Sequence, residues 1–339
     1  IDANWTCDNE PALPSKHSKD PVPTSSVFIL TCPITVKRVT GHKRSQGEDH
    51  AIVAEYDVTL WRSCSDHEPR NLGIPSDRAD KVVCTMVAGQ HRELHEWVEY
   101  HRLVGFDYFL IYVNEEFNKT ALPDSNDITY IPWNYKQLAN GESIPHQAAQ
   151  QHDCILRAGE RNVTWLAMHD VDEYIQLTTT NETLDQVLAQ NERVEELAGL
   201  QFQSWFFGSS NKSQEEVDDL VEKPISNERP PDALVMDDVW RGSFSYPQLR
   251  SMTEDRGGGR EKMIVRPCRV TYFACHKILV GDGITKTDET RIRLNHYKKT
   301  VHNRPFWAYK RIVRDTSLRD AFGQEMRKRL GLTARVEDD

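Results

Sequence analysis

Four consecutive residues, Asp170-Val171-Asp172-Glu173, are the part of this sequence best suited to chemistry. They follow an apolar run, residues 165–169, which is typical of a buried strand. Because side chains alternate along an extended chain, Asp170 and Asp172 are predicted to point to the same side. Two carboxylates at a strand end suit Mn²⁺ or Mg²⁺, which also binds phosphate. The alternative is structural, because acidic residues after a strand also cap helices and solvate turns.

The elements before this motif predict a sheet that presents it at one edge. Residues 82–87 and 108–113 are apolar runs typical of buried strands. A helix between them is predicted to end at Gly105, from side chains at helical spacing: Leu94, Trp97, Val98, His101 and Val104. This order is the βαβ unit of a parallel sheet. A second helix, 146–158, precedes the strand at 165–169. We therefore expect three strand ends, Val87, Asn114 and Asp170, at one edge, where open α/β sheets bind ligands.

The remaining pattern predicts an α/β protein in three parts. Further predicted elements are a helix at 183–190, strands at 200–207, 263–265, 269–273 and 291–294, and an amphipathic helix within 306–330. The polar, proline-containing stretch 212–260 is interpreted as a loop. The expected domains are an extended lead-in (1–24), a β-rich N-terminal unit (25–78) and the α/β domain with the acidic motif (79–339).

Charge and hydropathy limit the partners. Lys and Arg number 42 against 52 Asp and Glu, which gives a net charge of −10. Nucleic acids and anionic membranes are therefore poor partners. No apolar stretch is long enough to span a bilayer. The chain begins at Ile1 rather than Met, so we expect any membrane link to be an N-terminal signal or anchor that has been removed.

Sequons and cysteines indicate the secretory pathway. Five Asn residues fit the N-glycosylation acceptor pattern: Asn4, Asn118, Asn162, Asn181 and Asn211. Seven cysteines are compatible with an oxidising compartment and some disulfides. Cys84, inside an apolar strand, is expected to be a buried free thiol.

Four stretches, in order along the chain, resemble glycosyltransferase family 92 of the GT-A group of sugar-nucleotide enzymes. They are Val83-Cys84-Thr85-Met86 with Glu96-Trp97-Val98-Glu99-Tyr100-His101; Asp170-Val171-Asp172-Glu173-Tyr174; Phe207-Gly208-Ser209-Ser210 with Lys262-Met263-Ile264-Val265-Arg266-Pro267; and Leu294-Asn295-His296-Tyr297. The chain departs from the family in its N-terminal unit and between Ser210 and Arg260, which leaves the acceptor open.

The resemblance implies a GT-A-like, Rossmann-type fold with a mostly parallel central sheet flanked by helices. It implies an inverting, metal-dependent enzyme that moves a hexose, galactose from UDP-galactose, onto a glycan in the Golgi lumen. The family's Mn²⁺ or Mg²⁺ ligands correspond to Asp170, Asp172 and His296. A cation there would stabilise the departing diphosphate. For His296 alone, the structural alternative is a packed or hydrogen-bonding histidine.

The same comparison suggests donor-binding residues around the edge of the sheet. They are Thr85, Met86, Val87, Asn114, His146, Gln147, Asp170, Lys262 and Lys277. An inverting reaction also needs a carboxylate to accept the proton of the acceptor hydroxyl. Glu173 and Asp282 are the candidates, with four others left open: Glu215, Glu216, Asp237 and Asp238.

Two other functions remain compatible with the sequence. One is a different metal-dependent nucleotide enzyme, such as a nucleotidyltransferase, which would release pyrophosphate rather than UDP. The other is a non-catalytic carbohydrate-binding module with a degenerate site. The intact acidic motif and the Asn295-His296-Tyr297 segment favour an enzyme over the module.

Overall fold

The computed structural model describes residues 80–333, apart from 89, 115–122, 134–135, 140–141, 146, 180, 193–195, 209–232, 245–260, 275, 282, 288–290 and 298–308. Within residues 1–79 it describes little beyond short strands. There β1 (Ala3–Cys7) pairs with β5 (Val39–Ser45), and β5 pairs with β6 (Glu48–Ile52). Strand β1 lies in the predicted lead-in, so part of that segment pairs with the β-rich unit.

The central sheet has seven strands and confirms the α/β class. Its order is β20 (Ile284–Thr287), β14 (Leu197–Phe202), β17 (Lys262–Val265), β12 (Trp165–Met168), β7 (Lys81–Val87), β8 (Tyr108–Val113) and β9 (Ile128–Pro132). Strand β17 is antiparallel to both of its neighbours, whereas the other pairings in this sheet are parallel. The sheet is therefore mixed, and the expectation of a mostly parallel Rossmann-type arrangement is met only in part.

The predicted βαβ unit is confirmed. Helix α1 (His91–Val104) connects β7 to β8, which pair in parallel. The helix ends at Gly105, whose φ of 114° lies in the left-handed region, and the Gly105 N–H donates to the carbonyls of His101 and Arg102. A residue without Cβ adopts this conformation at little cost, so glycine suits this helix end.

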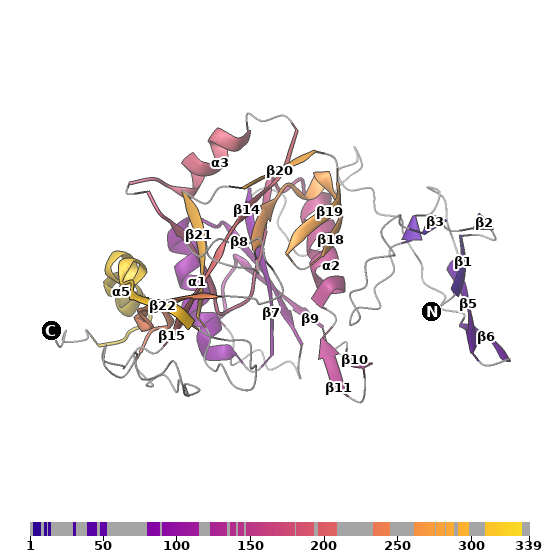
Figure 1. The fold of residues 1–339 in the computed structure, drawn as a ribbon, viewed down its shortest axis with the longest axis horizontal. Helices are drawn as coiled ribbons and strands as arrows, with labels where there is room; N and C mark the ends of the chain where they lie inside the picture. Colours follow the sequence, from indigo (N-terminus) through magenta and orange to yellow (C-terminus); the bar gives the residue numbers. More distant parts are fainter. Residues whose placement is uncertain are drawn as a thin grey trace.

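Two hydrophobic layers enclose the central strands, because the side chains of β7 alternate between its faces. Val83 and Val87 pack with Trp97 of α1, whereas Val82 and Cys84 pack on the side of helix α2 (Gln147–Glu160). Figure 1 shows the two helices on opposite sides of these strands. Full burial of a large apolar side chain such as Trp97 contributes roughly 2–3 kcal/mol, so both layers fix the sheet firmly.

A second, five-stranded sheet lies beside α1. Its order is β13 (Glu173–Leu177), β21 (Ile292–Tyr297), β15 (Ser204–Gly208), β16 (Trp240–Phe244) and β22 (Tyr309–Arg314). The predicted strand 200–207 is in fact two strands, because the chain leaves the central sheet at Phe202 and enters the second at Ser204. The predicted helix within 306–330 is also partly wrong. Residues 309–314 form β22 against β16, and α5 (Ser317–Arg329) begins only after it.

The shorter elements cover the periphery. They are α3 (Leu184–Glu192), β10 (Lys136–Ala139), β11 (Glu142–Pro145), β18 (Val270–Ala274), β19 (Lys277–Gly281) and the 3-10 turns η3 (Val235–Asp237) and η4 (Pro267–Arg269). Among the described helices, none combines the length and apolar character that a membrane span requires.

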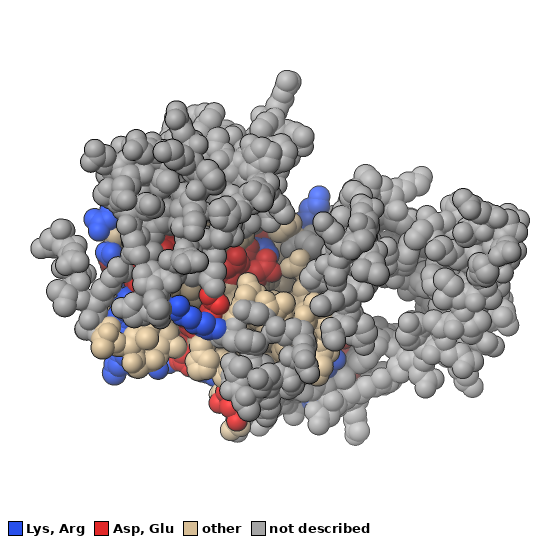
Figure 2. Space-filling model, turned by 90° about the horizontal axis from the view of Figure 1, so that it is seen from below, with Lys and Arg blue, Asp and Glu red and all other residues tan. Residues whose placement is uncertain are grey.

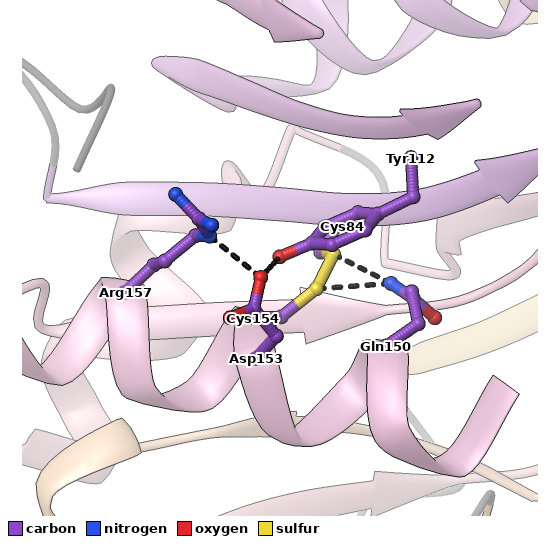
Figure 3. The surroundings of a disulfide bond; sticks show 6 residues. All are labelled: Cys84, Tyr112, Gln150, Asp153, Cys154 and Arg157. Carbon is purple, nitrogen blue, oxygen red and sulfur yellow. Dashed lines mark hydrogen bonds and ion pairs between the residues drawn. A yellow bond between two sulfur atoms is a disulfide. The ribbon is translucent and has the colours of Figure 1, made fainter. Parts of the chain in front are cut away.

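A disulfide joins Cys84 of β7 to Cys154 of α2, 70 residues later (Figure 3). The expectation that Cys84 is a free thiol is therefore wrong. The apolar context correctly indicated burial, but burial does not distinguish a thiol from a disulfide. The Gln150 amide donates to both sulfur atoms at 3.0 Å, and its side chain points to the bond in Figure 3. The bond links the middle of α2 to β7, the strand that ends at the predicted ligand-binding edge of the sheet.

Candidate active site

The acidic motif forms a tight turn between the two sheets. Strand β12 ends at Met168, residues 171 and 172 form the turn, and β13 begins at Glu173. The Asp170 N–H donates to Glu173 Oε2 at 2.8 Å, and the Glu173 N–H donates to the Asp170 carbonyl at 3.0 Å. Because this segment turns, the alternation expected for an extended strand does not apply. Asp170 and Asp172 contact different partners.

Lys262 is the buried cation of the site. Its side chain is 2% exposed, and its Nζ lies 2.9 Å from Glu173 Oε2 and 3.2 Å from Asp170 Oδ2. Strand β17 runs against β12, so its first residue lies beside the last residues of β12. Burial lowers the pKa of Lys262, but Asp170 and Glu173 more than offset this and raise it above its ordinary value. The ammonium is therefore charged at neutral pH.

Glu173 is buried, with a side-chain exposure of 1%. Burial raises its pKa, although Lys262 acts in the opposite direction. Its Oε2 accepts from the Asp170 N–H and faces Lys262, and its Oε1 faces His296 Nδ1 at 3.4 Å. This placement suits an internal bridging carboxylate. It does not suit a base that must meet a glycan hydroxyl arriving from solvent.

Asp172 and His296 face each other across the junction of β13 and β21. Antiparallel pairing places His296 opposite Glu173, and the Tyr297 N–H donates to the Asp172 carbonyl at 2.7 Å. His296 Nε2 then lies 3.4 Å from Asp172 Oδ2. The Asp172 side chain keeps 30% exposure, whereas that of His296 keeps 4%. One carboxylate oxygen and one imidazole nitrogen therefore converge at a point that solvent can reach.

Helix α1 holds the acidic turn at both ends. Trp97 Nε1 donates to the Glu173 carbonyl at 3.0 Å, and the Tyr100 hydroxyl donates to the Ile175 carbonyl at 2.5 Å. On the other side, His101 Nε2 lies 2.9 Å from His169 Nε2. The sequence did not predict these anchors, because Trp97 and His101 were identified only as periodic helix residues and as part of a family-like stretch. The available signal was a histidine at an apolar-spaced position.

The two histidines are neutral, so each ring has one nitrogen that can donate a hydrogen bond and one that can accept. Burial lowers the pKa of His101 to about 3, and burial followed by His101 lowers the pKa of His169 well below its ordinary value. His101 Nδ1 must donate to the Trp97 carbonyl at 2.7 Å, so its Nε2 accepts. His169 Nε2 therefore donates to His101. This chain joins the strand end before Asp170 to α1.

The residues predicted to bind the donor lie in different environments. Gln147, the first residue of α2, donates from Nε2 to Asp170 Oδ1 at 3.0 Å, so it joins the acidic group. Thr85 and Val87 have buried side chains, and Met86 is half-buried on the opposite face. Asn114 does lie at the strand end beside Val87, because its N–H donates to the Val87 carbonyl at 2.9 Å, but its side chain is 3% exposed.

Other predicted residues lie elsewhere. Lys277 is exposed on β19 in a separate two-stranded sheet, and no contact among the described residues joins it to the acidic group. Asp237 is buried and paired with Arg327 at 2.5 Å, and Asp238 is also buried, so neither faces an acceptor. Four predictions fall outside the described residues: His146, Glu215, Glu216 and Asp282.

The residues present can be compared with what a divalent cation requires. In the described part of the chain, no three His, Cys, Asp or Glu side chains are grouped closely enough to hold a metal as they stand. Asp172 and His296 nevertheless supply donor types suited to Mn²⁺, 3.4 Å apart. Asp170 fits less well, because its oxygens accept from Gln147 and Lys262. Acidic side chains are visible near the centre of the face in Figure 2.

Comparison with known proteins gives one consistent result. The sequence model of glycosyltransferase family 92 matches residues 81–333. A glycosyltransferase family 92 protein of Oryza sativa subsp. japonica is 29% identical over 215 residues, which cover 57% of this chain and 35% of that protein. One of Ricinus communis is 28% identical over 180 residues, 51% of this chain and 30% of that protein. The matched regions thus span about a third of these relatives.

Proposed function

Because the chain belongs to glycosyltransferase family 92, we propose that it transfers a hexose from a nucleotide-sugar donor to a glycan hydroxyl. The finer proposal is an inverting transfer of galactose from UDP-galactose that depends on Mn²⁺ or Mg²⁺. The observation that supports the metal dependence is the convergence of Asp172 and His296 at the edge of the central sheet, whereas the galactose donor and the inversion come from the family resemblance. Open α/β sheets bind nucleotides at such edges.

In this proposal Asp172 and His296 hold the cation, and Asp170 faces the same edge. A bound cation would neutralise charge on the departing diphosphate. Gln147 at the start of α2 adds an amide donor and the positive end of a helix dipole, both suited to an anionic donor. Helix α1 and Lys262 fix the turn in advance, so little ordering of the turn would remain for donor binding.

The proton acceptor is proposed to lie outside the acidic turn. An inverting reaction needs a carboxylate on the side of the sugar opposite the diphosphate. Glu173 is buried against Lys262, which argues against it as the base and leaves Asp282, Glu215 and Glu216 as the candidates from the sequence. We also propose that the protein acts in the Golgi lumen and is held there by an upstream anchor. The disulfide between Cys84 and Cys154 supports an oxidising compartment.

The test is a donor screen. Purified protein is incubated with several UDP-sugars and a glycan acceptor mixture, with and without Mn²⁺, and released UDP is measured. We expect turnover with UDP-galactose that depends on Mn²⁺, and a loss of at least about 100-fold in Asp172→Asn. The exposed Asp185 of α3 provides the control, because Asp185→Asn removes one carboxylate beside Lys81, at the opposite end of β7. Release of pyrophosphate, or no turnover with any UDP-sugar, would refute the proposal.

A further inference from the structure

We propose that Lys262 is a positioning residue, an internal counter-ion that occupies Asp170 and Glu173 and so reserves Asp172 and His296 for the cation. This inference rests on the proposed function. It departs from the sequence-level expectation that Lys262 touches the donor. A side chain that is 2% exposed, with its Nζ within 3.2 Å of two carboxylates, has little capacity to bind a phosphate as well.

The charges of the turn explain why such a residue is needed. Asp170, Asp172 and Glu173 would place three negative charges within four residues. Of the three side chains only that of Glu173 is buried, at 1% exposure, and a buried carboxylate requires a partner, whereas Asp170 and Asp172 keep 42% and 30% exposure. Without a fixed positive charge, a cation entering the site could bind any of the three. The ammonium of Lys262 already satisfies two of them. Asp172 is the one carboxylate of the three that Lys262 does not contact in the structure.

The position of Lys262 follows from strand direction. In a fully parallel sheet, the first residue of the strand next to β12 would lie at the opposite edge from the acidic turn. Strand β17 is reversed, so its first residue lies at the end of β12, where Met168 pairs with Met263. The reversal therefore brings a fixed positive charge beneath the turn.

Glu173 transmits this arrangement to His296. Its Oε2 faces Lys262 at 2.9 Å while its Oε1 faces His296 Nδ1 at 3.4 Å. A carboxylate beside one ring nitrogen of a histidine favours the N–H there and leaves the other nitrogen as a lone-pair donor. That other nitrogen, Nε2, faces Asp172. Lys262 thus acts through Glu173 on the orientation and tautomer of His296.

The experiment compares cation binding with turnover. Lys262→Met is prepared, and Mn²⁺ binding without donor is measured by electron paramagnetic resonance beside UDP release. We expect Mn²⁺ to bind about 5- to 10-fold more tightly, because two carboxylates lose their partner, while kcat falls at least about 50-fold because the cation is misplaced. The double variant K262M/E173Q removes one charge of each sign. Its Mn²⁺ affinity should return to within about 2-fold of the wild type.

Exposed Lys328 of α5 supplies the control, because Lys328→Met changes the net charge equally and should alter neither quantity. Weaker Mn²⁺ binding in K262M, or a raised donor KM with unchanged kcat, would overturn the inference in favour of direct donor contact. If K262M does not fold, the double variant decides: wild-type-like Mn²⁺ affinity supports the inference, and a loss above 10-fold overturns it.

Measuring Mn²⁺ binding and turnover separately distinguishes the failure of this inference from the failure of the proposed function. Mn²⁺ binding that responds to Lys262→Met, without turnover of any UDP-sugar, supports the counter-ion and refutes the transferase. Turnover of a UDP-sugar by protein that binds no Mn²⁺ would support the transferase and refute the counter-ion.

Discussion

Replacing His101 should remove an acid sensitivity from the folded protein. The pKa of His101 is lowered from 6.5 to about 3 by burial. Above pH 6.5 the ring is neutral in both the folded and the unfolded chain, so it adds no pH dependence. Below that value only the unfolded chain binds the proton. Stability attributable to His101 is therefore complete above about pH 6.5 and is lost as the pH falls towards 3.

The size of the effect follows from the same two values. At pH 5, about 1.5 units below the unfolded pKa of 6.5, the unfolded ring binds a proton and the folded ring does not. At about 1.36 kcal/mol per unit, this difference lowers the free energy of unfolding by about 2 kcal/mol. His169, whose pKa is also lowered, adds to the loss in the same direction. His101→Gln should reduce the fall in unfolding free energy between pH 7 and pH 5 by about 2 kcal/mol.

Urea unfolding followed by tryptophan fluorescence at the two pH values measures this difference. Any constant cost of the substitution cancels, because only the change with pH is compared. His95→Gln, at an exposed position of the same helix, controls for the loss of a histidine. A pH-dependent difference below about 0.5 kcal/mol between wild type and H101Q would refute the assignment of a buried neutral imidazole.

Three further outcomes are expected. Cys84→Ser should lower the unfolding free energy by about 4 kcal/mol in urea unfolding, because the bond to Cys154 closes a 70-residue loop. Reductant should destabilise the wild type but not the variant, so an equal effect on both would contradict this prediction. Arg327→Ala should cost about 3–5 kcal/mol in the same assay, because it leaves Asp237 buried without its 2.5 Å partner. Asn162, exposed in a turn with φ 53°, should carry an N-glycan when the chain is secreted from eukaryotic cells. Glycosidase treatment should then lower the mass of the wild type by one glycan more than that of Asn162→Gln.

The sequence predicted what local periodicity determines. The apolar runs at 82–87 and 108–113 and the helical spacing that ends at Gly105 each specify an element, and the short connections specify their pairing. The position of Asn114 beside Val87 at the edge of the sheet follows from that pairing alone. These features depend on neighbours within about 30 residues.

What could not be predicted depends on partners far along the chain. Nothing in Lys-Met-Ile-Val at 262–265 states its direction, although a lysine that opens an apolar strand was a hint of a buried counter-charge. Cys84 and Cys154 are 70 residues apart, and neither local context reveals the other. Residues 309–314 mix basic and β-branched side chains, and only β16 decides that they form a strand.

The hydrogen bonds from helix α1 to the acidic turn also imply an order of folding. Trp97, Tyr100 and His101 belong to the connection between β7 and β8, whereas the carbonyls and ring that they hold come more than 65 residues later. The turn can take its final shape only once the first βαβ unit has closed. Local opening of α1 would therefore dismantle the site while the strands of the central sheet stay paired. The Glu173 N–H donates to the Asp170 carbonyl within the turn, so its hydrogen exchange should follow that of the helix rather than that of β12.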